Sequence, residues 1–146
     1  MTAEEENQRV APLDGDAVRV LLEAGGWPCE LIADQTWRSY FRGRHAGFPF
    51  FVRVDPEGFI VFAILAYLRS PENESVAAAL YRRLLELNHV LLMAKFSIDD
   101  DLDVVLSVEH PIAELDRSEF DDAIDVLSYY ADQHYDELRA LAAAAS

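Results

Sequence analysis

Residues 59–68 form the most apolar segment of the chain, and they constrain the fold more than any other feature. Both alternating sets of side chains are apolar in the run Phe59-Ile60-Val61-Phe62-Ala63-Ile64-Leu65. An antiparallel strand with one face in water alternates apolar and polar side chains. The segment is also only about half as long as the ~20 residues of a membrane-spanning helix. We therefore expect a strand covered on both faces, by helices of its own domain, by a second copy of the chain or by an apolar segment of another protein.

Further strands are expected on either side of this one. Aromatic and β-branched residues dominate from Cys29 onward, and turn sequences occur at Ala46-Gly47 and Asp55-Pro56-Glu57-Gly58. These signals predict three antiparallel strands over residues 36–45, 48–54 and 59–68, the first of which could extend back toward Cys29. A hairpin is predicted later, over residues 95–98 and 103–109, around an Asp-rich turn.

Three helices are predicted around these strands. Asp14 is placed to cap the first helix, which ends at Gly25-Gly26. Ser70-Pro71-Glu72 has the cap, proline and acidic residue of a helix start, and it opens a helix that runs to about residue 93. Asp116-Arg117-Ser118-Glu119 has capping-box spacing and opens a last helix to about residue 141.

The resulting order is helix, three strands, helix, two strands, helix. It predicts an α+β fold (α-β3-α-β2-α), in which an antiparallel sheet packs with three helices. A chain of 146 residues with 51% hydrophobic residues suits a single globular domain, which we place at residues 13–142. Residues 1–12 are polar and acidic and end in Ala11-Pro12, so we expect a loose leader there.

The net charge of the chain bears on its partners and its compartment. The 27 acidic side chains outnumber the 12 basic ones, which gives a net charge of -15. Such a field opposes binding to nucleic acid and to anionic lipid. The start of the chain has neither the basic nor the apolar region of a signal peptide, and the single Cys29 cannot form an internal disulfide. We therefore expect a cytoplasmic protein that does not bind a membrane and for which nucleic acid is a disfavoured partner.

The middle helix carries more apolar surface than one core face requires. Plotted at 100° per residue, residues 76–92 place an apolar arc of about 200° on the helix, interrupted only by Asn88. A stripe of about 100° suffices for a helix that covers one side of its own core. The helix is therefore either sandwiched inside its own domain or packed partly against a second subunit.

The sequence contains no complete motif for catalysis, metal binding or cofactor binding. Asp99, Asp101 and Asp103 have the spacing of a calcium loop, but Val104 and His110 stand where glycine and glutamate are needed. The four histidines lack zinc-protease spacing, and His134 falls on the apolar face of the last helix, where a core histidine is expected. Cys29 fits a structural thiol. We expect no enzyme, no cofactor and no metal.

One basic and aromatic segment stands out against the acidic background. No carboxylate occurs between Asp34 and Asp55, whereas this stretch holds four arginines and six aromatic residues. Arg38, Arg42 and Arg44 share one side of the first strand with an intervening tyrosine. These arginines could pair with the protein's own acids, hold an acidic or extended peptide along the sheet, or bind single-stranded nucleic acid.

Residues 84–111 carry a resemblance to a known family. The segment Leu84-Leu85-Glu86-Leu87-Asn88-His89-Val90-Leu91-Leu92-Met93-Ala94-Lys95-Phe96 and the Asp-rich turn and Val-rich strand after it resemble the YbjN-like family. The order of elements also resembles the class I type III secretion chaperones, small acidic dimers that hold an extended segment of a client protein. The resemblance implies a chaperone-like protein without catalysis, with the middle helix and the following hairpin as the dimer surface.

These lines lead to one functional hypothesis and its site residues. We expect a homodimer that holds an extended segment of a partner protein; a regulatory adaptor that binds a folded partner is the alternative, followed by a protein associated with single-stranded nucleic acid. The expected partner-binding residues are Trp37, Tyr40, Phe41, Arg42, Phe48 and Phe50. The expected dimer-interface residues are Tyr81, Leu85, Asn88, Leu92 and Phe96.

Overall fold

The computed structural model describes residues 15–113 and 115–144. Its helices are α2 (Gly15–Ala24), α3 (Glu74–Val90) and α4 (Arg117–Ala142). Its strands are β1 (Glu30–Ala33), β2 (Thr36–Arg42), β3 (Gly47–Asp55), β4 (Phe59–Arg69), β5 (Ala94–Ile98) and β6 (Asp103–Pro111). The leader expected over residues 1–12 and the helix cap expected at Asp14 lie outside the described residues.

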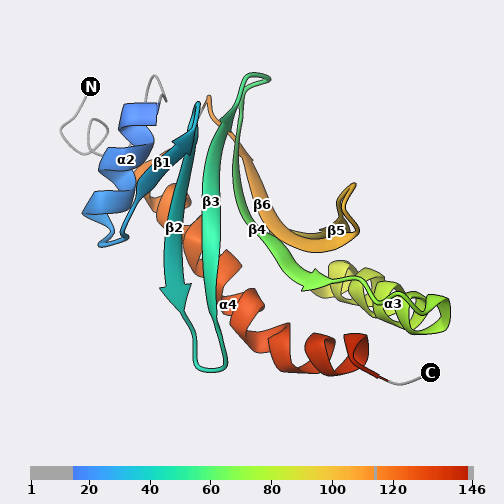
Figure 1. Cartoon of the computed structure of the whole chain (residues 1–146). Helices are drawn as coiled ribbons and strands as arrows, with labels where there is room; N and C mark the ends of the chain where they lie inside the picture. Colours follow the sequence, from blue (N-terminus) through green and yellow to red (C-terminus); the bar gives the residue numbers. More distant parts are fainter. Residues whose placement is uncertain (1–14, 114, 145–146) are drawn as a thin grey trace.

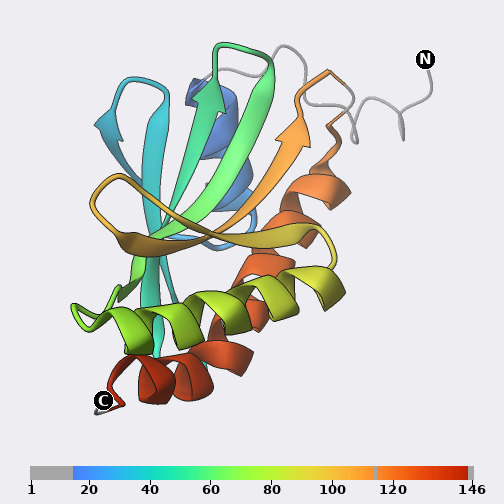
Figure 2. The same ribbon diagram turned by 90° about the vertical axis from the view of Figure 1, so that its right-hand side faces the viewer.

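The six strands form one antiparallel sheet in the order β1-β2-β3-β4-β6-β5. Figure 1 shows α2 to the left of the strands, α4 behind them and α3 at the lower right. In Figure 2 helices α2 and α4 lie behind the sheet, and α3 lies across its lower end. Apart from α3 at that end, the face toward the viewer in Figure 2 has no helix over it among the described residues. In Figure 2 the β5–β6 hairpin curls toward this uncovered side. The sheet is therefore a curved layer that, apart from α3 at its lower end, has helices on one face only.

The predicted α+β class is confirmed, but the sheet has one strand more than predicted. The strand predicted over residues 36–45 is preceded by a separate strand, β1, and the chain reverses between them at Gln35, whose φ is 55°. The same predicted strand also ends early, at Arg42, because the Gly43 N–H donates to the Ala46 carbonyl at 2.8 Å and closes a turn. Tight turns of this kind depend on local hydrogen bonds that strand periodicity does not reveal.

Helix α3 is shorter at both ends than predicted. Asn73 rather than Ser70 caps it, because the Asn73 Oδ1 atom accepts the N–H groups of Ser75 and Val76 at 2.9 and 3.1 Å. The helix ends at Val90 instead of residue 93, since Leu91 has an extended backbone. The predicted cap of α4 is confirmed by the Asp116 Oδ1 atom, which accepts the Glu119 N–H at 2.7 Å.

The hydrophobic core lies between the sheet and helices α2 and α4. Its largest fully buried side chains are Phe50, Phe62, Phe120, Leu22, Ile60, Ile64, Leu80, Leu106, Leu115, Ile124, Leu127 and Leu138. The Tyr67 hydroxyl on β4 donates to the Ala131 carbonyl on α4 at 2.7 Å. Burial raises the pKa of Tyr67 well above its ordinary value. This bond joins the sheet to α4 at the centre of the molecule.

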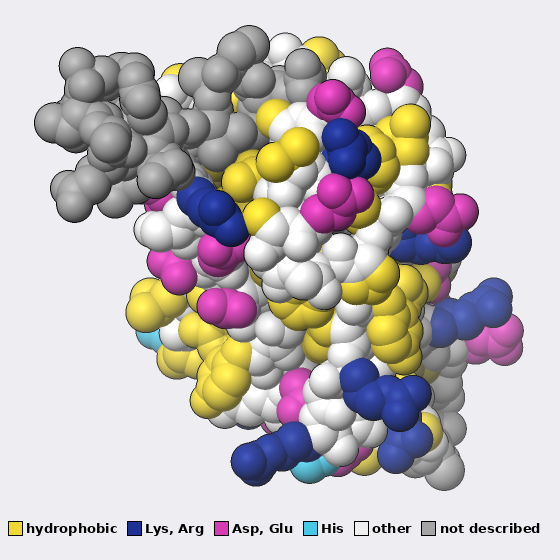
Figure 3. All heavy atoms as spheres, turned by 90° about the vertical axis from the view of Figure 1, so that its left-hand side faces the viewer, with side chains coloured by type: hydrophobic (Ala, Val, Ile, Leu, Met, Phe, Trp, Pro, Cys, Tyr) yellow, Lys and Arg dark blue, Asp and Glu magenta, His cyan; other side chains and the backbone are white. Residues whose placement is uncertain are grey.

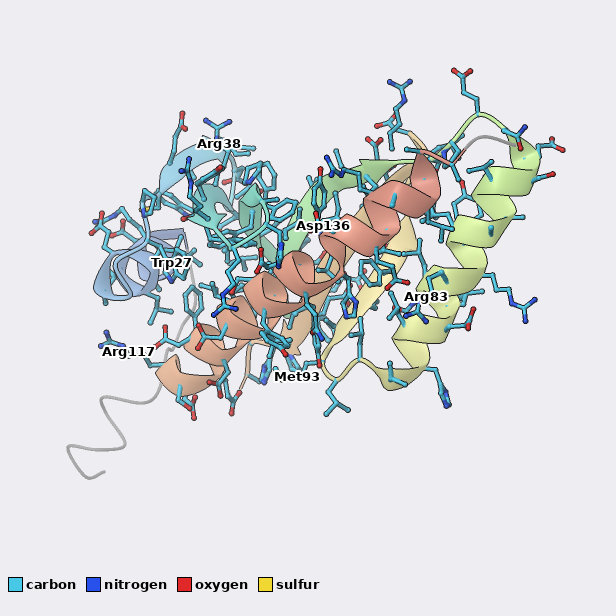
Figure 4. All side chains as sticks on the ribbon, turned by 90° about the horizontal axis from the view of Figure 1, so that it is seen from below. Trp27, Arg38, Arg83, Met93, Arg117 and Asp136 are labelled. Atoms are coloured by element: carbon cyan, nitrogen blue, oxygen red, sulfur yellow. The ribbon has the colours of Figure 1, made fainter. Side chains whose placement is uncertain are left out.

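Helix α3 packs on the rest of the fold with one side only. Its buried side chains are Val76, Ala77, Leu80, Leu84 and Leu87. Across the α3–α4 junction, the Arg83 Nε atom lies 2.7 Å from the Glu137 Oε2 atom, and Figure 4 shows Arg83 between the two helices. Leu91 is also buried and Tyr81 packs on the core, whereas Leu85 and Leu92 of the wide apolar arc remain exposed.

Candidate functional site

The described residues hold no group of three or more His, Cys, Asp or Glu side chains that could bind a metal ion. The Asp99 carboxylate instead accepts the backbone N–H groups of Asp101 and Asp103 at 3.0 and 2.9 Å. It therefore stabilises the β5–β6 turn, a common role for aspartate in tight turns. The calcium-like spacing at this position belongs to a hairpin turn.

The two candidate reactive side chains have pKa shifts that favour their neutral forms. Burial and the Glu23 carboxylate raise the pKa of the Cys29 thiol, which disfavours the nucleophilic thiolate. Burial lowers the pKa of His134, which stacks on the Tyr130 ring at 6.2 Å between centroids. His134 is half-buried on α4. It therefore packs at the edge of the core, whereas the sequence predicted a core histidine.

The uncovered face of the sheet, here called the open sheet face, is the first candidate binding surface. Strand register aligns one row of side chains straight across it: Arg38, Phe51, Ala63, Ser107 and Lys95 are successive neighbours on β2, β3, β4, β6 and β5. The curvature of the sheet encloses the middle of this row, so Ala63 and Ser107 are 6% and 4% exposed without any helix above them. The open sheet face is thus a concave surface with a narrow floor.

This concavity has an apolar floor and a charged rim. It forms a hollow of about 380 Å³, within the size range of small binding pockets. Its apolar lining residues are Ile32, Phe51, Val61, Ala63, Leu65 and Val105. At the rim, the Lys95 Nζ atom lies 2.9 Å from Glu109, and the Arg53 Nη1 atom lies 3.0 Å from Asp55. A bound group would meet apolar side chains in the centre and already paired charges at the edges.

A second hollow lies between the β2–β3 turn and α4, and it is called the hairpin hollow here. It measures about 850 Å³ and is lined by Trp27, Phe41, Arg42, Gly43, Arg44, His45, Ser128, Tyr129, Asp132 and Gln133. Figure 3 shows basic side chains and a histidine gathered at the lower end of the molecule, where this turn lies. The lining therefore combines aromatic and basic groups on an otherwise acidic protein.

The turn beside the hairpin hollow is held by α4. The Asp132 Oδ1 atom accepts the His45 N–H at 2.8 Å. Together with the N–H groups of Arg44 and Ala46, this bond lowers the pKa of Asp132. A Cβ atom on Gly43 would lie 2.2 Å from the Asp132 Oδ1 atom, so only glycine permits this approach. The carboxylate thereby fixes the position of the turn.

Exposed apolar side chains also gather on the second half of α3 and the turn after it. Leu85, Val90, Leu92 and Met93, here called the α3-turn surface, are 69%, 65%, 74% and 53% exposed. Figure 4 shows Met93 on the side of the molecule opposite Arg38. None of these four residues lines the hollow of the open sheet face.

The structure corrects four of the six expected partner-binding residues. Trp37, Phe41, Phe48 and Phe50 are 8%, 6%, 6% and 0% exposed, because their side of the sheet packs against α2 and α4. They belong to the core, and of the four Phe41 also lines the hairpin hollow. Tyr40 is 45% exposed and Arg42 is also exposed, so a partner role remains a prediction for these two.

The expected dimer residues divide in a similar way. Phe96 is 5% exposed, and the half-buried Asn88 is hydrogen-bonded to its backbone, so both act inside the domain. Tyr81 is half-buried and donates to the Ser70 hydroxyl at 2.8 Å. Leu85 and Leu92 project into solvent. A role in a dimer interface therefore remains a prediction mainly for Leu85 and Leu92.

Sequence reasoning missed the open sheet face as a candidate site. The signal was present, because Val61, Ala63 and Leu65 share one side of an apolar strand and Phe51 pairs with Ala63. Alternation alone does not say which side of a two-sided strand the helices cover. Four aromatic residues of β2 and β3 were therefore assigned to the surface when they belong to the core: Trp37, Phe41, Phe48 and Phe50.

Solved structures of other proteins share this fold. A chain in the heterodimeric ExoU–SpcU complex from the type III secretion system of Pseudomonas aeruginosa is 20% identical, with a TM-score of 0.58, over 85% of this chain and 96% of that one. YbjN from E. coli is 15% identical, with a TM-score of 0.63, over 88% and 95%. A chain of the ExsC–ExsE complex is 17% identical, with a TM-score of 0.53, over 91% and 100%. These similarities confirm the predicted type III secretion chaperone-like fold.

The family comparison is more direct. None of the curated proteins matches the sequence. Residues 14–140 match the YbjN family, described as "Putative bacterial sensory transduction regulator". Among the described residues, no helix has the length and apolar character needed to cross a membrane. Because the match extends over most of the sequence and the fold agrees with it, the chain belongs to the YbjN family.

Proposed function

We propose that this protein is a non-catalytic, cytoplasmic, chaperone-like homodimer that holds an extended segment of a partner protein. The observation that carries the proposal is the open sheet face, a concave apolar surface that no helix covers among the described residues. Large exposed apolar surfaces on soluble proteins commonly mark binding sites. Two of the structures with this fold, ExoU–SpcU and ExsC–ExsE, are protein complexes, which supports a protein partner.

The shape of the open sheet face favours an extended occupant. Residues from all six strands line the hollow, but its deepest part is only as wide as the side chains around Ala63 and Ser107. A single extended chain can place alternate side chains into such a floor while its backbone remains outside. A folded domain presents a broader and more convex surface. The extended segment therefore makes better use of the concavity.

The proposed dimer uses the α3-turn surface. Its exposed leucines, Leu85 and Leu92, continue the apolar arc of α3 beyond the part that packs on α4 and β5. Burying such side chains against a second copy would remove apolar area from water at about 25 cal/mol per Å². Since Leu85 and Leu92 are not among the residues that line the open sheet face, a dimer formed through them leaves that lining free to hold a client on each subunit.

Client capture with paired variants tests the open sheet face. Leu65→Glu places a charge in the hollow, whereas Val20→Glu makes the same change at an exposed position of α2. We expect affinity capture from the source cells to recover a client with the wild type and Val20→Glu, and to lose it with Leu65→Glu. Limited proteolysis of the complex should then leave a short client fragment bound. Equal capture by both variants would reject the open sheet face as the client site.

A regulatory adaptor that binds a folded partner is the second candidate, and the family description as a sensory transduction regulator favours it. The proteolysis step separates the two functions. A partner domain that stays intact and bound after proteolysis would support the adaptor. A short protected fragment would support the chaperone-like function.

A further inference from the structure

Two arginines that line the hairpin hollow form no ion pair with an acidic side chain of the described residues. The ion pairs of the described residues involve Arg19, Arg38, Arg53, Arg82, Arg83 and Lys95 as their Lys and Arg members. Arg42 and Arg44 form none among these residues, although the chain has a net charge of -15. They flank Gly43 at the tip of the β2–β3 hairpin and both line the hollow. The hollow therefore contains two cations available to an external carboxylate.

Two acidic side chains of α4 beside this turn are already engaged by it. Asp132 accepts the backbone N–H of His45 at 2.8 Å, and the Asp136 Oδ2 atom lies 3.1 Å from the His45 Nδ1 atom. Figure 4 shows Asp136 on the part of α4 that passes below the sheet. Both carboxylates thus satisfy groups of the turn itself, and no other carboxylate of residues 15–113 and 115–144 forms an ion pair with the two guanidinium groups.

Aromatic side chains supply the apolar part of the same hollow. Tyr129 on α4 is 62% exposed. Trp27 is half-buried and held edge-on against Phe50, with 5.5 Å between ring centroids. A volume of about 850 Å³ accommodates several peptide side chains. The hollow therefore matches a ligand that carries acidic and apolar groups close together.

The hollow is also fixed in place before any ligand binds. The Gly43 N–H bond to Ala46 closes the turn, and Asp132 ties that turn to α4. Holding the binding groups in position reduces the ordering cost of association. Arginine is suited to this role because its planar guanidinium group binds carboxylates in a bidentate manner.

We propose that the hairpin hollow binds an acidic segment of a partner protein, with carboxylates on Arg42 and Arg44 and an apolar side chain against Trp27 and Tyr129. The proposal rests on the proposed partner-binding function and adds a second contact site, away from the open sheet face. A short acidic segment fits better than nucleic acid. The few charges of such a segment can be confined to the two arginines, whereas the continuous charge of a phosphate backbone would extend into the field of a chain with a net charge of -15.

Fluorescence anisotropy with a defined probe tests the proposal on the full chain. The probe is a short fluorescein-labelled peptide in which glutamates alternate with tryptophan and leucine, and its control has glutamine in place of each glutamate. We expect the acidic probe to bind and the glutamine peptide to bind about tenfold more weakly or not at all. Equal binding of the two peptides would overturn the proposal.

Two double variants with the same change in net charge locate the site. R42A/R44A should lower the affinity for the acidic probe about tenfold or more. R82A/R117A, which removes two exposed arginines elsewhere, should change this affinity by no more than about twofold. R42K/R44K should recover part of the affinity, because lysine keeps the charge but not the bidentate geometry. Equal weakening by both alanine pairs would show non-specific charge attraction and reject the site.

Two further measurements separate this proposal from the proposed client site on the open sheet face and from nucleic-acid binding. Leu65→Glu should leave probe binding unchanged, so loss of the open sheet face as a client site would not affect this result. A fluorescein-labelled oligothymidine that binds in an Arg42- and Arg44-dependent manner, and more tightly than the acidic probe, would replace the acidic segment with nucleic acid. Circular dichroism melting of R42A/R44A checks that the turn remains folded.

Discussion

The side-chain amide of Asn88 on α3 pairs with both backbone groups of Phe96 on β5. The Asn88 Nδ2 atom donates to the Phe96 carbonyl at 3.0 Å, and the Asn88 Oδ1 atom accepts the Phe96 N–H at 2.7 Å. Strand β5 is the last strand of the sheet, and unpaired groups on such an edge invite added strands. Asn88 therefore blocks strand addition at the centre of β5 and ties α3 to the sheet.

Replacing Asn88 should destabilise this end of the molecule. Asn88→Ala leaves two backbone groups of a partly buried edge without partners, at a cost of about 1–3 kcal/mol in the free energy of unfolding. Chemical denaturation measures the loss, and hydrogen exchange should show faster exchange of the Phe96 amide. His89→Ala, at the exposed neighbouring position, is the control and should change little. Unaltered exchange at Phe96 in Asn88→Ala would contradict the structural role given to this asparagine.

Asp132 should make the stability of the β2–β3 turn depend on pH. Its pKa is lowered by the backbone N–H of His45, with further contributions from Arg44 and Ala46. A carboxylate with a lowered folded pKa stabilises the fold above its unfolded pKa near 4, and this contribution is lost as the pH falls through the folded value. The difference in unfolding free energy between the wild type and Asp132→Asn should be present at neutral pH and shrink at about pH 3. A pH-independent difference would rule this contribution out, and Asp122→Asn on the same helix is the control.

His134 should act in a different pH window. Burial lowers its pKa, while Glu137 raises it and Arg83 lowers it further. The unfolded state therefore binds a proton more readily, and stability falls as the pH drops below the unfolded value of about 6.5. His134→Gln should flatten the stability profile between about pH 6.5 and 5. Thermal melting across this range checks the prediction, which fails if the two profiles have the same slope.

The α3-turn surface should determine the oligomeric state. Leu85→Asp and Leu92→Asp place a charge in the proposed interface and should convert a dimer of twice 16.5 kDa into a monomer. Light scattering at several concentrations measures the mass directly. Val20→Asp, an equally polar change on the exposed side of α2, should leave the dimer intact. A wild type that stays monomeric at every concentration would reject the homodimer and its interface together.

Local sequence signals predicted most elements, because their causes are local. The Asp116 cap of α4 and the hairpin around Asp99 depend on contacts within a few residues, and both are found where the sequence placed them. The separate strand β1 was not predicted, because the reversal at Gln35 contains neither glycine nor proline. The start of α3 was misplaced because Ser70-Pro71 and Asn73 are competing caps.

The sequence alone determined the fold class, the surplus of apolar surface on β4 and α3, and the concentration of arginines between Asp34 and Asp55. Tertiary structure alone decided which side of each strand is the core. Trp37 and Phe50 face the helices, whereas Phe51 and Leu65 line the open sheet face. Within the described part of the chain, tertiary structure also left Arg42 and Arg44 without an acidic partner, because α4 brings Asp132 to the backbone of the turn instead of to their side chains. Period-two alternation defines two sides of a strand, but only packing against distant helices assigns one of them to water.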